Sequence, residues 1–190
     1  MAHDIQPATP VQKQGLAERR GTYFTIIRAI DSFTTITGKA VAWLVIPMVL
    51  GLVYEVFARY MFKAPTLWAY DLTYMLYGTL FMLGAAYTLM RGGHIRTDML
   101  YHAWSPKTQG TVDAVCYILF FFPGIFFFLI AGVEYASLSW AMGEKAFGSA
   151  WQPPIYPFKS VIPITAVLLL IQGVSELLKS LYAARKGEWL

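Results

Sequence analysis

Long apolar stretches alternate with short polar ones along this chain. Two uncharged stretches, Leu72–Met90 and Ala114–Val133, have about the 20 residues that a membrane-spanning helix needs. Two further stretches reach this length when the polar residues at their ends lie at the membrane interface. The pattern predicts an all-α membrane protein with four transmembrane helices, over residues 40–62, 69–90, 112–140 and 160–180.

A soluble bundle with buried helices is the rival interpretation of the same pattern. Helices at the surface of such a bundle have polar outer faces, and residues 80–90 and 117–132 have none. The composition points the same way, because 57% of residues are hydrophobic and only 14% are charged, against roughly 45–50% and about 25% in soluble domains. The mean hydropathy is +0.50, and the membrane interpretation is favoured.

The segments outside the spans divide the chain into three parts. Residues 1–21 are polar and contain no apolar core of a secretory signal, which predicts a disordered cytoplasmic tail. Residues 22–183 form the predicted membrane domain, and residues 184–190 form a second cytoplasmic tail. Apolar residues recur at helical spacing over 23–36. This segment fits either an interfacial amphipathic helix or a cytoplasmic extension of the first span, and both alternatives stay open.

The distribution of basic residues predicts the orientation. With both termini on one side, that side carries 11 Lys and Arg residues and the other carries 4. Cytoplasmic segments carry the excess of Lys and Arg, so both termini are expected in the cytoplasm. This asymmetry also accounts for the net charge of +4, and a nucleic-acid partner is not expected.

The loop between the third and fourth spans is then expected outside. Proline restricts its own backbone and that of its predecessor, which predicts a stiff, extended loop. Aromatic residues suit the headgroup level of a membrane, and they also suit a docking surface. The candidate residues of this loop are Trp151, Pro153, Pro154 and Tyr156.

Signals of catalysis or of a bound cofactor are few. The three histidines lie outside the spans, which disfavours a membrane subunit holding haem through axial histidines. His94 and Asp98 are four residues apart in the second loop, where capping of the next helix is a better interpretation than a metal site. The single cysteine, Cys116, allows no disulfide within one chain. The chain is predicted to be no enzyme and to hold no cofactor or metal.

An autonomous transporter would show ionisable residues deep in the membrane. Here the acidic residues associated with the spans all lie within about two helical turns of a predicted helix end, which favours a scaffold. The residues concerned are Glu55, Asp71, Asp113, Glu134 and Glu176.

Two features suggest contacts between helices. Glu55 and Arg59 have the spacing of a helical ion pair, and Asp71 starts the next helix, so Arg59 is expected to be clamped between both carboxylates. This cluster would pin the hairpin or order a surface for another subunit. Gly84 and Thr88 have the small-xxx-small spacing that allows close approach of helices.

Residues spread over all four spans resemble the small membrane subunit of TRAP transporters, the DctQ type. The similarity covers roughly residues 24–183, and Asp71 stands where many relatives of that family carry Glu. The residues that carry it are Arg59-Tyr60, Phe62, Pro65, Trp68, Asp71, Gly84-Ala85-Ala86, His94-Ile95, Asp98 and Ile162-Pro163-Ile164.

The resemblance implies a role in a three-component secondary transporter of the bacterial inner membrane. A periplasmic protein captures an organic acid, and a large membrane subunit carries it across with sodium. The small subunit acts as scaffold for the large one and as docking platform for the periplasmic protein, so sodium and substrate ligands are expected in the other components. The alternatives are a membrane anchor of a redox or other enzyme complex and an autonomous small transporter.

Overall fold

The computed structural model describes residues 10–93 and 104–189, with side chains at residue 21 and from residue 23 onward within these ranges. His94 and Asp98 lie outside the described residues, and their role in the second loop stays a prediction. The described part is helical and contains no strand, only an isolated bridge between Lys145 and Pro154.

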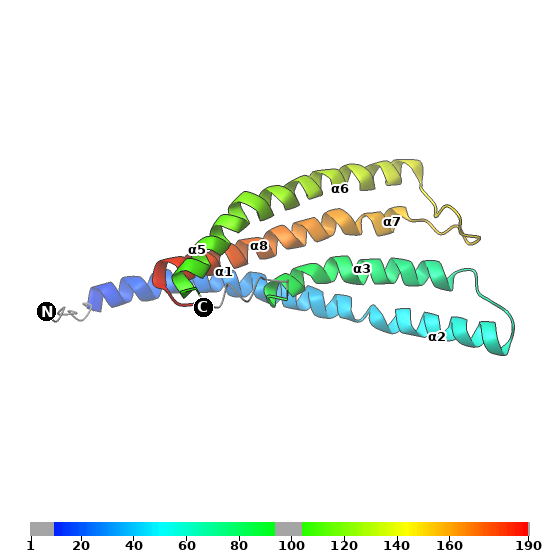
Figure 1. Ribbon diagram of the computed structural model, residues 1–190, viewed down its shortest axis with the longest axis horizontal. Coiled ribbons are helices and arrows are strands. Elements are labelled where there is room, and N and C mark those ends of the chain that lie inside the picture. The colour runs from blue at the N-terminus through cyan, green and yellow to red at the C-terminus, as the bar shows by residue number, and fades with distance from the viewer. Residues whose placement is uncertain (1–9, 94–103, 190) are drawn as a thin grey trace.

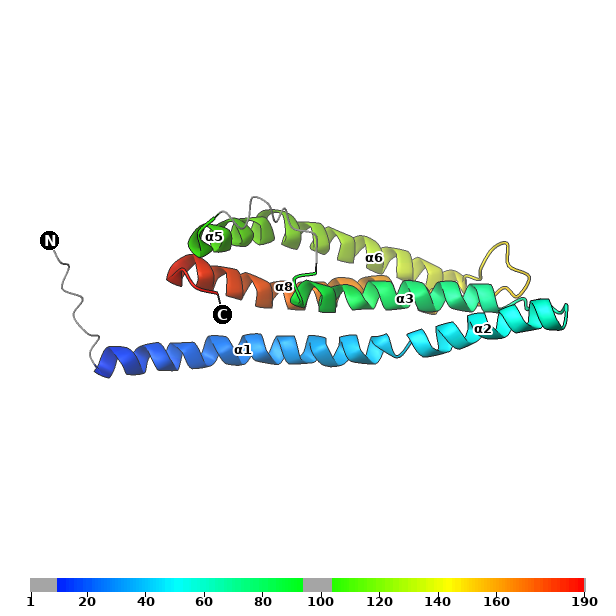
Figure 2. The same cartoon turned by 60° about the horizontal axis from the view of Figure 1, so that its bottom comes forward.

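The helices follow one another along four rods that share a common direction (Figures 1 and 2). The helix bounds are α1 (Pro10–Ala42), α2 (Val45–Met61), α3 (Ala69–Met90), α5 (Pro106–Cys116), the π-helical turn η1 (Tyr117–Phe121), α6 (Phe122–Met142), α7 (Tyr156–Lys159) and α8 (Val161–Lys186).

Four helical stretches are long and apolar enough to cross a membrane, as predicted. They are Tyr23–Met61, Ala69–Met90, Pro106–Met142 and Tyr156–Lys186. The last is buried over 33% of its most apolar window, whereas the others are buried over only 6–11%. The fourth rod, which consists of α7 and α8, therefore lies at the centre of the bundle. Its long helix α8 contacts α1, α3, α5 and α6.

The first rod is longer than the predicted span. α1 begins at Pro10, within the segment for which the sequence predicts disorder, and residues 11–20 include the good helix formers Leu, Ala, Glu, Gln, Lys and Arg. Residues 23–42 run in line with α2 (Figure 2), so this segment has the arrangement of an extension of the first span.

Prolines explain the breaks within the first and third rods. Pro47 has no N–H for the carbonyl of Trp43, and the N–H of Ile46 donates to that carbonyl at 3.1 Å instead. This shifted bond lies at the turn between α1 and α2. In the third rod, η1 ends at Phe121, two residues before Pro123. The wider π-helical turn relieves the clash of this proline with the preceding turn.

The bundle has two distinct ends (Figure 1). We call the end that carries the turn 62–68 and the loop 143–155 the hairpin end. The opposite end, which carries α5, the end of α8 and the first half of α1, we call the terminal end. Gly143 and Gly187 end α6 and α8 in the left-handed conformation, with φ of 58° and 73°, which glycine adopts without strain.

Candidate functional site

Glu55 is the centre of the polar contacts that close the α2–α3 hairpin. One of its oxygens accepts hydrogen bonds from Arg59 Nε at 2.8 Å and from the terminal Nη2 at 2.5 Å. The other accepts from the backbone N–H of Thr66 at 2.8 Å and from the Thr66 hydroxyl. The Glu55 side chain is only 12% exposed and that of Arg59 is 56% exposed. Glu55 therefore fixes the turn, and Arg59 covers it.

The predicted clamp of Arg59 between two carboxylates is wrong in its second half. Among the described residues, no ion pair joins Arg59 to Asp71. The Asp71 carboxylate instead accepts a hydrogen bond from the hydroxyl of Ser149. Spacing along the chain brings Asp71 near the hairpin, but the packing of the rods places it against the loop 143–155.

Trp68 and Pro65 lie in the turn beside this cluster. The ring of Trp68 stacks on that of Tyr54, with 5.8 Å between centroids and 23° between planes. Pro65 is exposed. Trp68 thus fastens the turn to α2, while Pro65 belongs to its outer surface.

The loop 143–155 is held at both of its ends. Ala146 N donates to the carbonyl of Pro153 at 2.9 Å, and Ile155 N donates to that of Glu144 at 3.0 Å. The Glu144 carboxylate pairs with Lys159 Nζ at 2.5 Å. This hydrogen bond holds the pKa of the Glu144 carboxyl below its ordinary value, against the opposing effect of desolvation.

Of the aromatic residues in and next to this loop, some pack against the helices and others are exposed. Tyr156 packs on Trp140, with 4.5 Å between ring centroids, and Trp140 Nε1 donates to the Ser160 hydroxyl at 2.7 Å. Trp151 is 46% exposed and Phe147 is 95% exposed. Pro153 is buried and Pro154 is exposed. The hairpin end therefore presents aromatic side chains on a loop tied down by hydrogen bonds.

Gly84 does not mediate a close helix contact with any residue that the structure describes. A Cβ atom built on Gly84 meets no heavy atom within 4 Å, and Thr88 only donates back to the Gly84 carbonyl at 3.1 Å. The close contacts lie at other glycines. A Cβ on Gly110 would lie 2.6 Å from backbone atoms of α8, and one on Gly173 would lie 2.4 Å from Phe121.

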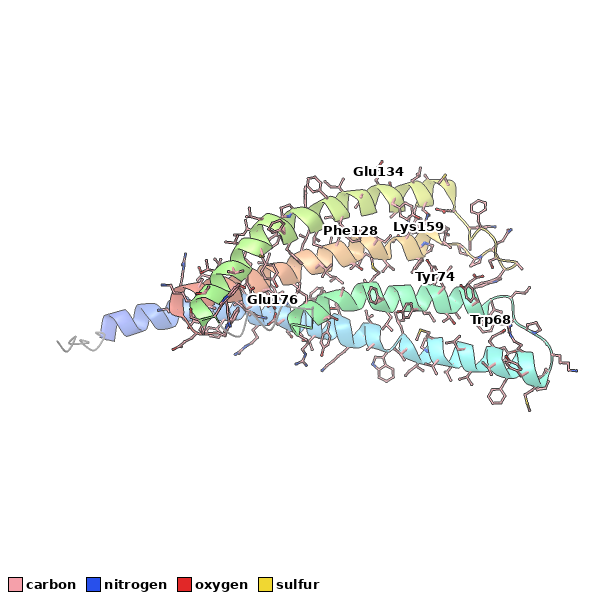
Figure 3. The ribbon with its side chains drawn as sticks, in the orientation of Figure 1. Trp68, Tyr74, Phe128, Glu134, Lys159 and Glu176 are labelled. Atoms are coloured by element: carbon pink, nitrogen blue, oxygen red, sulfur yellow. The ribbon has the colours of Figure 1, made fainter. Side chains whose placement is uncertain are left out.

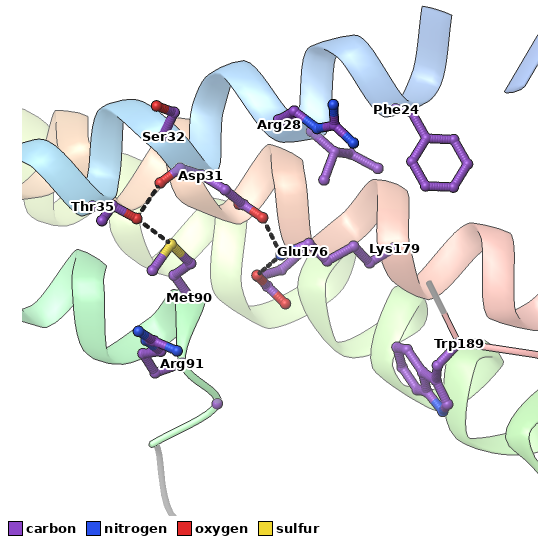
Figure 4. Close-up of a pocket in the computed structure, with 12 residues that line it drawn as sticks. Phe24, Arg28, Asp31, Ser32, Thr35, Met90, Arg91, Glu176, Lys179 and Trp189 are labelled. Carbon is purple, nitrogen blue, oxygen red and sulfur yellow. Dashed lines mark hydrogen bonds and ion pairs between the residues drawn. The ribbon is translucent and has the colours of Figure 1, made fainter. Parts of the chain in front are cut away.

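A polar network between α1 and α8 was not predicted from the sequence. Lys179 Nζ lies 2.8 Å from an oxygen of Asp31 and 2.7 Å from one of Glu176 (Figure 4). The other Asp31 oxygen accepts hydrogen bonds from Gln172 at 3.0 Å and Ser175 at 2.8 Å. Gln172 is fully buried.

A signal for this network was present in the sequence. Gln172, Ser175, Glu176 and Lys179 recur at the spacing that places residues on one face of a helix. Such a polar stripe in a mostly apolar helix marks a face that needs polar partners. The interpretation of Glu176 as a helix-end residue overlooked it, because α8 continues ten residues further, to Lys186.

The flanks of the bundle are apolar and largely uncovered. Side chains project outward from all four rods (Figure 3). The flank of α2 exposes Leu50, Val56 and Phe57, and that of η1 and α6 exposes Phe120, Phe127 and Leu138, each by more than half. This arrangement suits contact with lipid and with other membrane helices, while the polar groups are concentrated toward the two ends.

Comparison with protein families gives one assignment. Residues 48–182 match the family described as tripartite ATP-independent periplasmic transporters, DctQ component. No curated protein and no solved structure matches the chain. The matched segment covers more than half of the chain and includes α3, α6 and most of α2 and α8. The chain therefore belongs to the DctQ family and is a small membrane subunit of a TRAP transporter.

Proposed function

We propose that this chain is the scaffold on which the large TRAP membrane subunit assembles, and that its hairpin end forms a docking platform for the periplasmic substrate-binding protein. The family supports membership of a three-component transporter. The observation that carries the scaffold role is the low burial of three of the four spans, 6–11% of their most apolar windows. Helices of this kind have whole faces available to lipid and to a partner's helices.

The exposed aromatic loop at the hairpin end supports the docking role. Phe147 and Trp151 project from a loop that hydrogen bonds hold in place. A pre-ordered loop loses little conformational entropy when a protein binds it, and aromatic side chains are common anchors of interfaces.

The orientation and transport chemistry complete the proposal. The excess of Lys and Arg at the terminal end favours the cytoplasm for both termini, with the hairpin end in the periplasm of a bacterial inner membrane. In the described bundle, the charges of Asp31, Glu176 and Lys179 face one another. Paired charges of this kind stabilise a scaffold, and we assign sodium coupling and organic-acid binding to the other components.

Co-purification with the large subunit tests the scaffold role. Gly84→Leu places a large side chain on an open part of α3, so the small subunit should fold normally and retain less of the large subunit. Gly84→Ala is the matched control, because alanine preserves a small surface. Equal retention of the large subunit by Gly84→Leu, Gly84→Ala and the natural chain would remove α3 from the interface.

Substrate uptake in reconstituted vesicles tests the docking role. Trp151→Ser should lower uptake while the two membrane subunits still co-purify. Trp43→Ser, which changes a tryptophan that is 70% exposed between α1 and α2, is the control and should leave docking intact. Normal uptake by the Trp151→Ser complex would contradict docking through this residue.

A further inference from the structure

A hollow of about 620 Å³ opens at the terminal end, between α1, α3 and α8 (Figure 4). Its lining includes three basic residues, Arg28, Arg91 and Lys179, and two acidic ones, Asp31 and Glu176. The side chains of Phe24, Met90 and Trp189 complete its apolar rim. The hollow therefore combines a small net positive charge with apolar walls.

The two arginines supply the binding capacity of the hollow. Lys179 is occupied by both acidic residues, at 2.8 and 2.7 Å. Neither Arg28 nor Arg91 forms an ion pair with a described residue. Arg91 Nε donates to the Tyr87 hydroxyl at 3.1 Å, and the guanidinium lies 5.5 Å from the centre of that ring. This contact orients Arg91, and its terminal nitrogens have no ion-pair partner among the described residues, so they can bind an anion.

The position of the hollow along the bundle selects the kind of anion. Arg91 directly follows the last residue of α3, Met90, so it lies where an apolar span ends. Phe24 and Trp189 are 38% and 40% exposed at this level. Aromatic residues beside arginines at the end of a span are typical of the headgroup region of a membrane.

We propose that this hollow binds the headgroup of an anionic phospholipid. The guanidinium groups of Arg28 and Arg91 donate hydrogen bonds to the phosphate oxygens, for which their planar geometry is suited. The acyl chains lie against Met90, on the membrane side of Arg91, while Phe24 flanks the headgroup. A free phosphate ion would gain nothing from these apolar walls, so the lining favours a lipid. The site would place one ordered lipid between the first and last helices of the bundle.

Native mass spectrometry of the full-length chain tests this site. The purified protein is incubated with phosphatidylglycerol, and retained lipid is measured against phosphatidylcholine as the zwitterionic comparison. Each lost cation should weaken binding about fivefold, since a basic residue near an anionic surface contributes about 1 kcal/mol. Arg28→Gln and Arg91→Gln are the test variants. Lys63→Gln, at the hairpin end, removes the same charge and should bind as the natural chain does.

The outcomes separate the alternatives without any partner subunit. Selective retention of phosphatidylglycerol, weakened about fivefold in Arg28→Gln and unchanged in Lys63→Gln, supports the site. Equal retention of both lipids, or equal loss in Lys63→Gln, overturns it. Thermal stabilisation by inorganic phosphate that matches stabilisation by phosphatidylglycerol would assign the hollow to a free anion and overturn the lipid. If Arg91→Gln fails to fold because its contact with Tyr87 is lost, Arg28→Gln alone decides, because Arg28 is exposed.

Discussion

At the scale of single residues, charged side chains in this protein are held by partners from other segments. Lys179 bridges Asp31 of α1 and Glu176 of its own helix. Glu55 closes a hairpin by binding Arg59 and the turn residue Thr66. In both cases a carboxylate that would be costly in a membrane is neutralised and hydrogen-bonded. Such contacts fix which helix faces meet.

Lys179→Met should destabilise the fold, because it leaves the carboxylates of Asp31 and Glu176 without their cation. In the ion pair of Lys179 with Asp31, the lysine side chain is 18% exposed and the aspartate side chain is 28% exposed. The loss in the free energy of unfolding should therefore be about 1–3 kcal/mol, between the values for exposed and buried pairs. Thermal unfolding in detergent measures the loss. Lys145→Met, which changes an exposed lysine, is the control, and equal stability of both variants would contradict a structural role for Lys179.

The ion pair of Glu144 with Lys159 should make stability depend on pH. The pKa of Glu144 is lowered by folding from its ordinary value of 4.5. Its contribution is therefore fully present above pH 4.5 and is lost as the pH falls through the lower, folded pKa. Glu144→Gln should be less stable than the natural chain at pH 7, and the difference should shrink below pH 4.5.

Thermal unfolding between pH 3 and pH 7 measures that difference. In the Lys159→Met background the pH-dependent effect of Glu144→Gln should be much smaller, because the ammonium that lowers the pKa is gone. An effect of Glu144→Gln that stays constant over this pH range would show that the carboxylate's charge adds nothing to stability.

At the scale of helices, close packing in the bundle depends on small residues facing α8. Gly110 of α5 lies against the backbone at Ser180 and Ala184, and Ala166 and Ala183 of α8 are fully buried. Without a strong hydrophobic force between helices in lipid, such close approach supplies much of the packing energy. The position of a small residue therefore matters more than its spacing in the sequence.

Gly110→Ala should destabilise the bundle, because the added methyl group would lie 2.6 Å from backbone atoms of α8 that cannot move aside easily. Overpacking of this kind costs roughly 1–3 kcal/mol. Gly84→Ala is the control, since nothing lies within 4 Å of its Cβ position. A midpoint of thermal unfolding for Gly110→Ala at or above that of Gly84→Ala would show that α5 moves away without cost.

At the scale of the whole molecule, the bundle has two chemically different ends joined by apolar flanks. The hairpin end presents Phe147 and Trp151, and the terminal end presents Arg28 and Arg91, neither of which forms an ion pair with a described residue. A membrane protein with this division can contact a protein on one side and lipid headgroups on the other. Both proposals made above depend on this polarity.

Cysteine labelling of intact cells should reveal that polarity. With Cys116 replaced by Ser, Lys63→Cys and Phe147→Cys should react with an impermeant thiol reagent added outside. Lys107→Cys and Lys186→Cys should react only after the cells are opened. Reaction of Lys63→Cys and Phe147→Cys on opposite sides would contradict the fold, and joint reaction of both only from inside would reverse the proposed orientation.

The sequence alone determined the number of apolar helices long enough to span a membrane, and the family. These properties follow from local composition, because a run of about 20 apolar residues is stable in lipid wherever its neighbours lie. The predicted span 69–90 corresponds to α3 at both ends. The helical pairing of Glu55 with Arg59 was likewise predictable, since residues four apart meet on one helix face.

Only the tertiary structure decided which distant residues meet. Asp71 reaches Ser149, and Asp31 reaches Gln172, Ser175 and Lys179, across separations of more than 70 residues. These contacts depend on the rotation of each helix about its axis, which small differences in side-chain packing set. Hydropathy along the chain is nearly insensitive to that rotation, and for this reason Gly84 and Gly110 could not be told apart by sequence.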